Sequence, residues 1–545
     1  MHKSNFKVIK LFNVAENKMV ENMSSDVTAL KRPSRSSEEN AFNKVQRKKL
    51  KRRFYLISLG VVLLFSGYSA VVSLQSSINI TDGAGTRSIS TTYVTQVFVS
   101  FFIAPLLLRL LSPKVVLIIS ECCYLVYVAA NFFPSTVTLT IGSIFAAFAE
   151  ALFWVPVAIC FVHFGKEYHK YSDQPEVVCL MLFNGILFGM FMLNQILGNT
   201  FVFLILHFLT SSSHGNQLEI TKIENTSLIP ALPTVTESTY TSMAELSVNP
   251  FQFCGANDCQ DPNVTKSNIT QYVPSNPVAL YALLGCFVAV MLSGIVIHFL
   301  LVPDISLKTL NKQSYKPSNK QSAEEVDLAT INHVTTENEG NLRKIFHMTC
   351  SAIKDSFIMF FHPLHLLVAP MMIYFGLDFA FVISEATRSL ASCALGVSQV
   401  GSCMITFASF NALTCYISGR QLGKYGPLTL VIVGMIFDLI AQIIMLSWTP
   451  TMDALWVIYL LFSLWGISNA LWQVSMAATY GSDIYKTKEV SFSLWCVCFA
   501  LGMAIETSIG GLLCVRQKIY ILMSWLIIAI GLFTLHARKS RKRFA

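Results

Sequence analysis

The chain has 545 residues, of which 53% are hydrophobic and 13% are charged, and its formal net charge is +9. A soluble domain cannot bury so large an apolar fraction, because too much of a globular fold is surface. A lipid bilayer accommodates it when each span has about 20 residues and forms a helix that satisfies its own backbone hydrogen bonds. The composition therefore excludes an ordinary soluble domain and predicts a multispan membrane protein.

Long apolar segments follow one another in two sets of six, separated by a polar segment at 303–356. The first set is predicted at 54–74, 90–111, 115–133, 137–163, 177–209 and 278–302. The second set is predicted at 363–384, 390–417, 428–448, 454–480, 490–513 and 519–535. The predicted fold class is an all-α membrane protein with 12 transmembrane helices in two six-helix halves, 54–302 and 357–537.

Lysine and arginine near the ends of the spans predict the orientation in the membrane. One basic run at 47–53 precedes the first span, and another lies within the final segment, 538–545. Both termini are therefore expected in the cytosol, together with the linker 303–356. The polar tail 1–53 is expected to be disordered.

Glycosylation sequons agree with this orientation, because four of them fall on the side that it makes external. Asn79 follows the first span, and the other three lie in the outer loop 210–277: Asn225, Asn263 and Asn268. The topology is therefore consistent between two independent signals.

The outer loop also holds the segment Cys254-Gly-Ala-Asn-Asp-Cys259. In an oxidising compartment, two cysteines around such a turn are expected to form a disulfide with each other. Two free thiols are the alternative. A metal site is not expected, because the loop offers no nearby histidine.

Paired strings in the fourth and tenth spans suggest an internal duplication. They are Ala-Leu-Phe-Trp154-Val-Pro and Ala-Leu-Trp472-Gln-Val-Ser. Between spans eight and nine, the segment 419–426 (Gly-Arg-Gln-Leu-Gly-Lys-Tyr-Gly) is similar to the loop signature of the major facilitator superfamily. Gly423 stands where that signature has an aspartate, and the loop 109–114 between spans two and three is more degenerate. The resemblance therefore does not imply the gating ion pair of the superfamily.

Longer strings resemble the Unc-93 family, best its homologue A branch. They include Phe54-Tyr-Leu-Ile-Ser-Leu-Gly60, Asn131-Phe-Phe-Pro134, Gln195-Ile-Leu-Gly-Asn199, Ser392-Cys-Ala-Leu-Gly396 and Leu464-Trp-Gly-Ile-Ser-Asn-Ala-Leu-Trp-Gln473. The resemblance covers nearly the whole chain from Phe54 onward. It implies a major-facilitator-like frame that regulates another integral membrane protein, such as a two-pore-domain potassium channel subunit.

Carboxylates lie inside the predicted spans, where a charge costs roughly 2.5–3.5 kcal/mol on insertion scales and usually serves a function. They are Glu121, Glu150, Asp378, Asp438 and Glu506. Functionally they are candidates for proton or cation coupling in a central cavity. The alternatives are packing groups, or acids that pair with a basic residue of a partner helix. No lysine or arginine is predicted at comparable depth.

Two further pairs are candidates for a site. Glu385 and Arg388 lie three residues apart, so that their side chains face each other on a helix and form a candidate outer gate or an ordinary interfacial pair. Trp154 and Trp472 are candidates for lining a cavity, with aromatic packing as the alternative.

The sequence has no nucleotide-binding loop, zinc-ligand spacing or nucleophile elbow, so no enzyme, metal site or cofactor is expected. Nucleic acid is not an expected partner, because the basic charge is confined to membrane-flanking segments; membrane lipids are. The predicted function is regulation of a potassium channel through intramembrane contacts, at the plasma membrane rather than the endolysosomal membrane. The alternatives are a proton- or cation-coupled secondary transporter of a small solute and a trafficking escort.

Overall fold

The computed structural model describes residues 37–78, 84–133, 135–198, 200, 253–259, 277–307, 339–396, 399–482, 487–509 and 512–544. The predicted glycosylation sites lie outside these ranges: Asn79, Asn225, Asn263 and Asn268. The chain divides into two units, 1–49 and 50–545. The described part of the first unit is the beginning of one helix, and the site described below lies within the second unit.

All regular structure in the described residues is helical. The first half comprises α2 (Ser37–Ile78), α3 (Ala84–Phe98), η2 (Val99–Ile103), α4 (Ala104–Leu110), α5 (Pro113–Ala130), α6 (Thr136–Lys170), α7 (Glu176–Phe191) and α10 (Pro277–Leu301). The second half comprises α13 (Glu339–Phe360), α14 (Pro363–Ala380), η5 (Phe381–Leu395), α15 (Val400–Ile417), η7 (Ser418–Leu422), η8 (Gly423–Tyr425), α16 (Pro427–Ser447), η9 (Met452–Ala454), α17 (Trp456–Gly481), α18 (Lys488–Ile509) and α19 (Val515–Phe544). The short helix η3 (Gly255–Asn257) belongs to the segment between α7 and α10.

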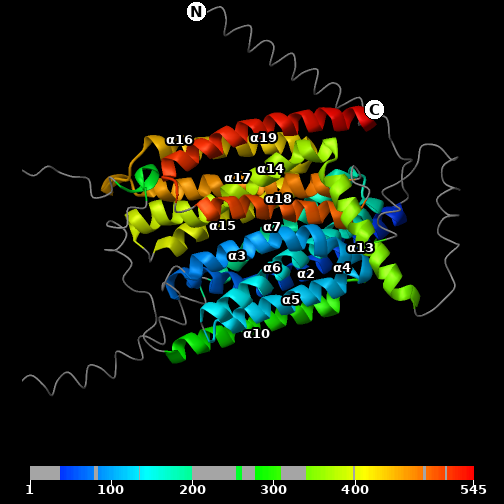
Figure 1. The fold of residues 1–545 in the computed structure, drawn as a ribbon. Helices are drawn as coiled ribbons and strands as arrows, with labels where there is room; N and C mark the ends of the chain where they lie inside the picture. The colour runs from blue at the N-terminus through cyan, green and yellow to red at the C-terminus, as the bar shows by residue number, and fades with distance from the viewer. Residues whose placement is uncertain are drawn as a thin grey trace, which may run out of the picture. The chain divides into compact units, whose positions relative to one another are not determined.

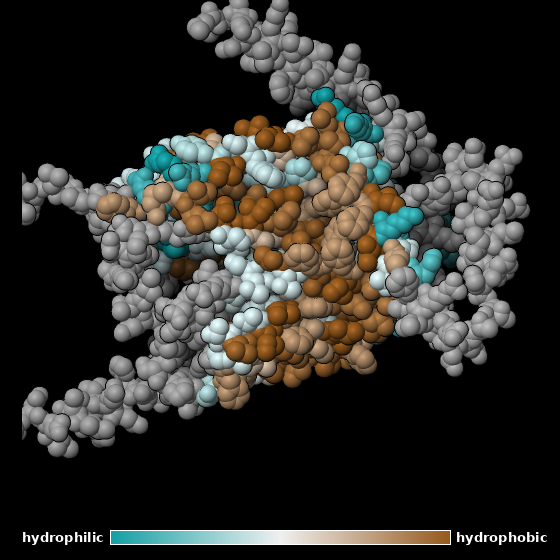
Figure 2. All heavy atoms as spheres, in the orientation of Figure 1, coloured by the Kyte–Doolittle hydropathy of each residue, from teal (hydrophilic) through white to brown (hydrophobic). Residues whose placement is uncertain are grey.

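Within the described residues, 12 helical segments are long and apolar enough to cross a membrane. Figure 1 shows the helices of the first half, coloured blue to green, gathered beside those of the second half, coloured yellow to red. Hydrophobic residues follow the helices along their length, and hydrophilic residues gather toward their ends (Figure 2). The predicted fold class is confirmed.

Local signals in the sequence explain where several helices begin. Ser112 caps α5 by accepting a hydrogen bond from the Val115 backbone N–H, and Pro113 occupies the first turn. Ser135 and Thr138 form a capping box at the start of α6. These caps set where the third and fourth spans enter the bilayer.

Several boundaries differ from those predicted, among them the following three. Helix α2 already begins at Ser37, so the prediction that the whole of 1–53 is disordered is wrong for 37–53; this segment is rich in lysine, arginine and glutamate, which favour a helix. The predicted linker 303–356 contains most of α13. Residues 390–395 belong to η5 and not to the eighth span, because the chain does not break until Gly396, whose φ is +91°.

The two halves approach closely where α7 meets α15 and η7. A Cβ atom on Gly185 would lie 2.5 Å from the Cys415 carbonyl oxygen and 2.8 Å from the Gly419 Cα. Glycine is therefore required at this crossing, as in other close contacts between membrane helices. The contact holds α7 of the first half against the second half and helps to enclose the centre of the molecule.

Candidate functional site

Glu150 lies near the middle of α6 and is partly exposed, whereas the other four predicted coupling acids are buried. The Trp154 indole Nε1 donates a hydrogen bond to Glu150 Oε2 at 2.8 Å. Among the described residues, no lysine, arginine or histidine forms an ion pair with Glu150. Cys496 of α18 lies near the carboxylate, which places Glu150 between the two halves.

Aromatic rings surround this carboxylate. The rings of Tyr68 and Tyr124 lie 4.5 Å apart, and both residues are close enough to Glu150 to interact with it electrostatically. The ring of Trp154 lies 6.5 Å from that of Trp495 across the interface between the halves. Among the described residues, Glu150 is thus the one predicted coupling acid that is partly exposed, and it lies within an aromatic environment.

A cavity of about 10 Å³ lies against the other side of Trp154. Its walls come from α6 and α7 in the first half and α17 and α18 in the second: Trp154, Val157, Ala158, Phe161, Leu187, Phe188, Ala477, Phe492 and Trp495. This volume holds about one water molecule. The cavity itself therefore has no room for a solute larger than water.

Trp472 does not lie beside this cavity. It is fully buried, its Nε1 donates to the Val431 carbonyl oxygen at 3.2 Å, and its ring lies 5.4 Å from that of Tyr374. All of these partners belong to the second half. The prediction that Trp472 lines a cavity is therefore wrong; Gly434 on α16 leaves room for the indole, which packs inside that half.

Asp378 and Asp438 meet inside the second half. Tyr374 on α14 donates its hydroxyl to Asp438 Oδ2, and the Gln442 side-chain amide donates to the same oxygen at 2.9 Å. Asp378 lies one turn beyond Tyr374 and is fully buried near Asp438. Asp438, Tyr374 and Gln442 form a polar network between α14 and α16, whereas the carboxylate oxygens of Asp378 have no hydrogen-bond partner among the described residues.

Glu121 forms a buried pair in the first half. Its Oε1 accepts from His298 Nδ1, and the second ring nitrogen of His298 lies 2.9 Å from the Ile57 carbonyl oxygen. Both side chains are fully buried. The pair joins α5, α10 and α2, which indicates a structural role for Glu121.

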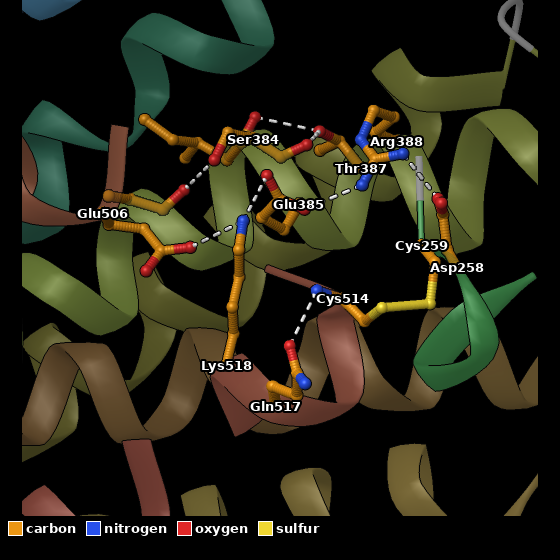
Figure 3. Close-up of polar contacts among 12 residues, drawn as sticks. Asp258, Cys259, Ser384, Glu385, Thr387, Arg388, Glu506, Cys514, Gln517 and Lys518 are labelled. Atoms are coloured by element: carbon orange, nitrogen blue, oxygen red, sulfur yellow. Dashed lines mark hydrogen bonds and ion pairs between the residues drawn. A yellow bond between two sulfur atoms is a disulfide. The ribbon is translucent and has the colours of Figure 1, made fainter. Parts of the chain in front are cut away.

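Glu385, Arg388 and Glu506 belong to one cluster with Lys518 (Figure 3). Lys518 Nζ lies 2.8 Å from Glu385 Oε1 and 3.5 Å from Glu506 Oε1. Arg388 lies 2.8 Å from Glu385, which confirms that these two side chains face each other, and 2.5 Å from Asp258 Oδ2. The cluster ties η5, α18, α19 and the segment 253–259 together.

Two disulfides hold the segment 253–259 against the second half. They join Cys254 to Cys393 and Cys259 to Cys514, and the second is visible in Figure 3. The predicted bridge between Cys254 and Cys259 is therefore wrong. The segment lies between η5 and the start of α19, so that each of its two cysteines meets a different cysteine of the second half, with Cα–Cα distances of 5.7 and 4.1 Å.

Arg109 joins the halves at the opposite end of the bundle. Its guanidinium lies 2.7 Å from Asp355 on α13 and 3.6 Å from Glu489 at the start of α18. The ion pair could not be predicted from the sequence of this loop, because the acids that bind Arg109 lie more than 200 residues further along the chain. Helix α13 crosses this end of the bundle (Figure 1).

The structure also corrects the prediction that no basic residue lies as deep as the acids. Lys518 is fully buried beside Glu506. The predicted last span, 519–535, does not include it. The helix begins at Val515, within reach of the acids of η5 and α18. Lys518 directly precedes the apolar run 519–535, and this position is the signal in the sequence that it can lie within the last span.

Comparisons with known proteins agree with the resemblance seen in the sequence. No family model matches the chain. "Protein unc-93 homolog A" of Xenopus laevis is 27% identical over 481 residues, covering 88% of this chain and 91% of that protein. The Homo sapiens protein of the same name is 29% identical and covers 88% and 92%. These relatives confirm the resemblance to the Unc-93 family.

A more distant relative and the solved structures extend the comparison. A Caenorhabditis elegans protein named "Putative potassium channel regulatory protein unc-93" is 20% identical over 91% of this chain and 62% of its own length. The human organic anion transporter MFSD10 is 11% identical with a TM-score of 0.52, covering 89% of this chain and 99% of that one. The proton:xylose symporter XylE is 10% identical with a TM-score of 0.52, covering 90% and 95%. The structural likenesses show a major facilitator fold.

Proposed function

We propose that this relative of the Unc-93 family regulates a potassium channel of the two-pore-domain class through contacts within the membrane. The observation that carries the proposal is that most of the intramembrane acids bind partners within this chain. Glu121 is paired with His298, Glu506 with Lys518, and Asp438 with Tyr374 and Gln442. A frame in which three of the five intramembrane acids are held by partners within the chain has fewer groups left to couple a solute to an ion gradient.

The surroundings of these pairs support a regulatory role for the frame. The cavity beside Trp154 has room for about one water molecule, so the frame holds no ready space for a solute there. The disulfides fix part of the segment between α7 and α10 to the second half. The name of the Caenorhabditis elegans relative supports a potassium channel as the partner. The two-pore-domain class comes from the family resemblance in the sequence.

Co-expression with a two-pore-domain potassium channel tests this function. Potassium current is recorded with and without the protein, and the channel at the cell surface is quantified in the same cells. The proposal expects the current per surface channel to change and the two proteins to co-purify. An unchanged current per surface channel together with a changed surface amount supports the trafficking escort and contradicts regulation.

A second candidate function is proton- or cation-coupled transport, and one observation favours it. Glu150 is partly exposed between the halves and has no basic partner among the described residues. A transporter needs such an acid to titrate as solute moves. Purified protein in vesicles would then take up a small solute when a proton gradient is imposed.

The variant Glu150→Gln separates this alternative from the first. It removes the titrating group but keeps an acceptor for the Trp154 indole. Loss of uptake in Glu150→Gln supports transport, whereas Glu167→Gln on the surface of the same helix, whose side chain pairs with Lys170, is the matched control. No gradient-driven uptake by the unmodified protein contradicts transport.

A further inference from the structure

A cavity of about 190 Å³ opens where the two halves meet, at the end of the bundle that contains the start of the first span. Lys51 and Tyr55 of α2 and Leu182 and Ile186 of α7 line it from the first half, and Tyr416 and Arg420 line it from the second. The volume is below the roughly 300–1,000 Å³ of pockets for drug-sized ligands. The cavity therefore suits a small polar group with part of its carrier outside.

Both cations of this cavity lack an acid. Among the described residues, neither Lys51 nor Arg420 forms an ion pair with a carboxylate. Lys51 Nζ lies 5.1 Å from the centre of the Tyr168 ring, and Arg420 donates a hydrogen bond to the Tyr416 hydroxyl. The guanidinium of Arg420 and the ammonium of Lys51 thus retain donors for an anion from outside the chain.

The corresponding loop of the other half shows what such an arginine does when an acid is present. Arg109 follows the second span as Arg420 follows the eighth, and Arg109 binds Asp355 and Glu489. The acid placed like Glu489 is Glu176, at the start of α7, but Glu176 pairs with Lys166 at 3.6 Å. Arg420 therefore lacks the acid that its counterpart has.

We propose that this cavity binds the phosphate group of an anionic membrane lipid. Arg420 and Lys51 supply charge-assisted hydrogen bonds to phosphate oxygens, and the two tyrosine hydroxyls add donors. Leu182 and Ile186 provide an apolar wall for the part of the lipid next to the phosphate. In the predicted orientation this end faces the cytosolic leaflet, where phosphoinositides and other anionic lipids are concentrated.

A lipid in this cavity would join the two halves. Lys51 belongs to the first half and Arg420 to the second, so the phosphate takes the place that Glu489 occupies beside Arg109. Occupancy would favour the arrangement in which this end of the bundle is closed. A lipid site at this position is compatible both with channel regulation and with solute transport.

Binding of dioctanoyl phosphatidylinositol 4,5-bisphosphate to the full-length purified protein tests the proposal. Each basic residue near an anionic lipid contributes about 1 kcal/mol, so Lys51→Gln and Arg420→Gln should each weaken binding about fivefold, and the double variant about 25-fold. Lys424→Gln is the matched control: it lies in the same loop, over the Tyr425 ring, and does not line the cavity. Its affinity should stay within about twofold of the unmodified protein.

Two further measurements test the source of the phosphate and the role of the charge at Arg420. Inorganic phosphate and inositol 1,4,5-trisphosphate are tested as competitors, and Arg420→Lys tests whether retained charge preserves most of the binding. The proposal expects the lipid to bind at least tenfold more tightly than either soluble compound. Equal affinity for inositol trisphosphate would overturn the lipid assignment, and an equal loss in Lys424→Gln would overturn the site.

Discussion

Arg109 Nε lies 3.6 Å from Glu489 Oε1, joining the end of α4 in the first half to the start of α18 in the second. Asp355 of α13 binds the same guanidinium at 2.7 Å, so the helix that precedes the seventh span takes part in the contact. The arrangement joins the two halves at the end of the bundle that is predicted to be cytosolic. It gives the molecule an ion pair whose loss should favour separation of the halves at that end.

Arg109→Gln should therefore expose groups near the centre. Cys496 is 2% exposed and lies near Glu150, so its labelling by a maleimide reports separation of α18 from α6. A partly exposed ion pair contributes roughly 0.2–1 kcal/mol, so labelling should increase up to about fivefold. Labelling is measured by mass spectrometry, with Cys496→Ser to identify the signal.

Lys114→Gln is the control for this variant, because it removes a cation near the same loop that lies over the Phe299 ring instead of binding an acid. Its Cys496 labelling should equal that of the unmodified protein. Equal labelling in Arg109→Gln and the unmodified protein would show that the Arg109 contact does not hold the halves together.

Lys518→Gln should destabilise the protein strongly. It leaves Glu385 and Glu506 buried beside one another without the cation that they share. Breaking a buried ion pair from one side costs about 3–5 kcal/mol. A lower midpoint of thermal unfolding in detergent is the expected result, with Lys539→Gln at an exposed position as the control.

Adding Glu506→Gln to Lys518→Gln should recover part of this loss, because it removes the carboxylate that loses its cation, whereas Glu385 keeps Arg388. A midpoint for Lys518→Gln that matches the control would contradict the buried cluster shown in Figure 3.

Glu121→Gln and Glu150→Gln should differ in stability although both remove a carboxylate from a span. Glu121 is fully buried against His298, so its neutral variant loses a charge-assisted hydrogen bond of about 1.5–3 kcal/mol. Glu150 has no basic partner among the described residues, so Glu150→Gln should lower the free energy of unfolding by no more than about 1 kcal/mol. Unfolding midpoints of the two variants, measured side by side, check this difference; equal losses would contradict it.

The pairing of the cysteines can be read from peptides of the unreduced protein. Digestion should release Cys254 linked to Cys393 and Cys259 linked to Cys514. Cys254→Ser should leave the second bridge in place, because the two bridges have no cysteine in common. A peptide in which Cys254 is linked to Cys259 would contradict the structure and restore the local pairing.

The spans were predictable from the sequence because length and apolar composition decide whether a helix crosses a membrane. The ends of the spans were less predictable. Lysine and arginine before Phe54 marked orientation but also favour a helix, so α2 begins at Ser37. The seventh span runs on to Leu395 because no glycine or proline lies between Gly376 and Gly396.

The candidate site was predictable only in its residue types. Each acid was found, but its partner depends on which helix faces it: His298 and Glu121 are 177 residues apart. The pairing of Cys254 with Cys393 could not be predicted for the same reason, because the two cysteines are 139 residues apart. A turn between Cys254 and Cys259 favoured the local pairing instead. Cys393 lies within Ser392-Cys-Ala-Leu-Gly396, one of the strings that resemble the Unc-93 family. Its presence in that string is the only hint in the sequence that Cys393 takes part in a bridge.

The central claim is that a major-facilitator frame serves here to regulate a potassium channel, and current per surface channel tests it most directly. Whole-cell potassium current is divided by the amount of channel at the surface, with and without this protein and with Lys518→Gln as a destabilised control. The account predicts a change in this ratio with the unmodified protein and a smaller change with the variant. An unchanged ratio, together with gradient-driven uptake by the purified protein, would contradict it.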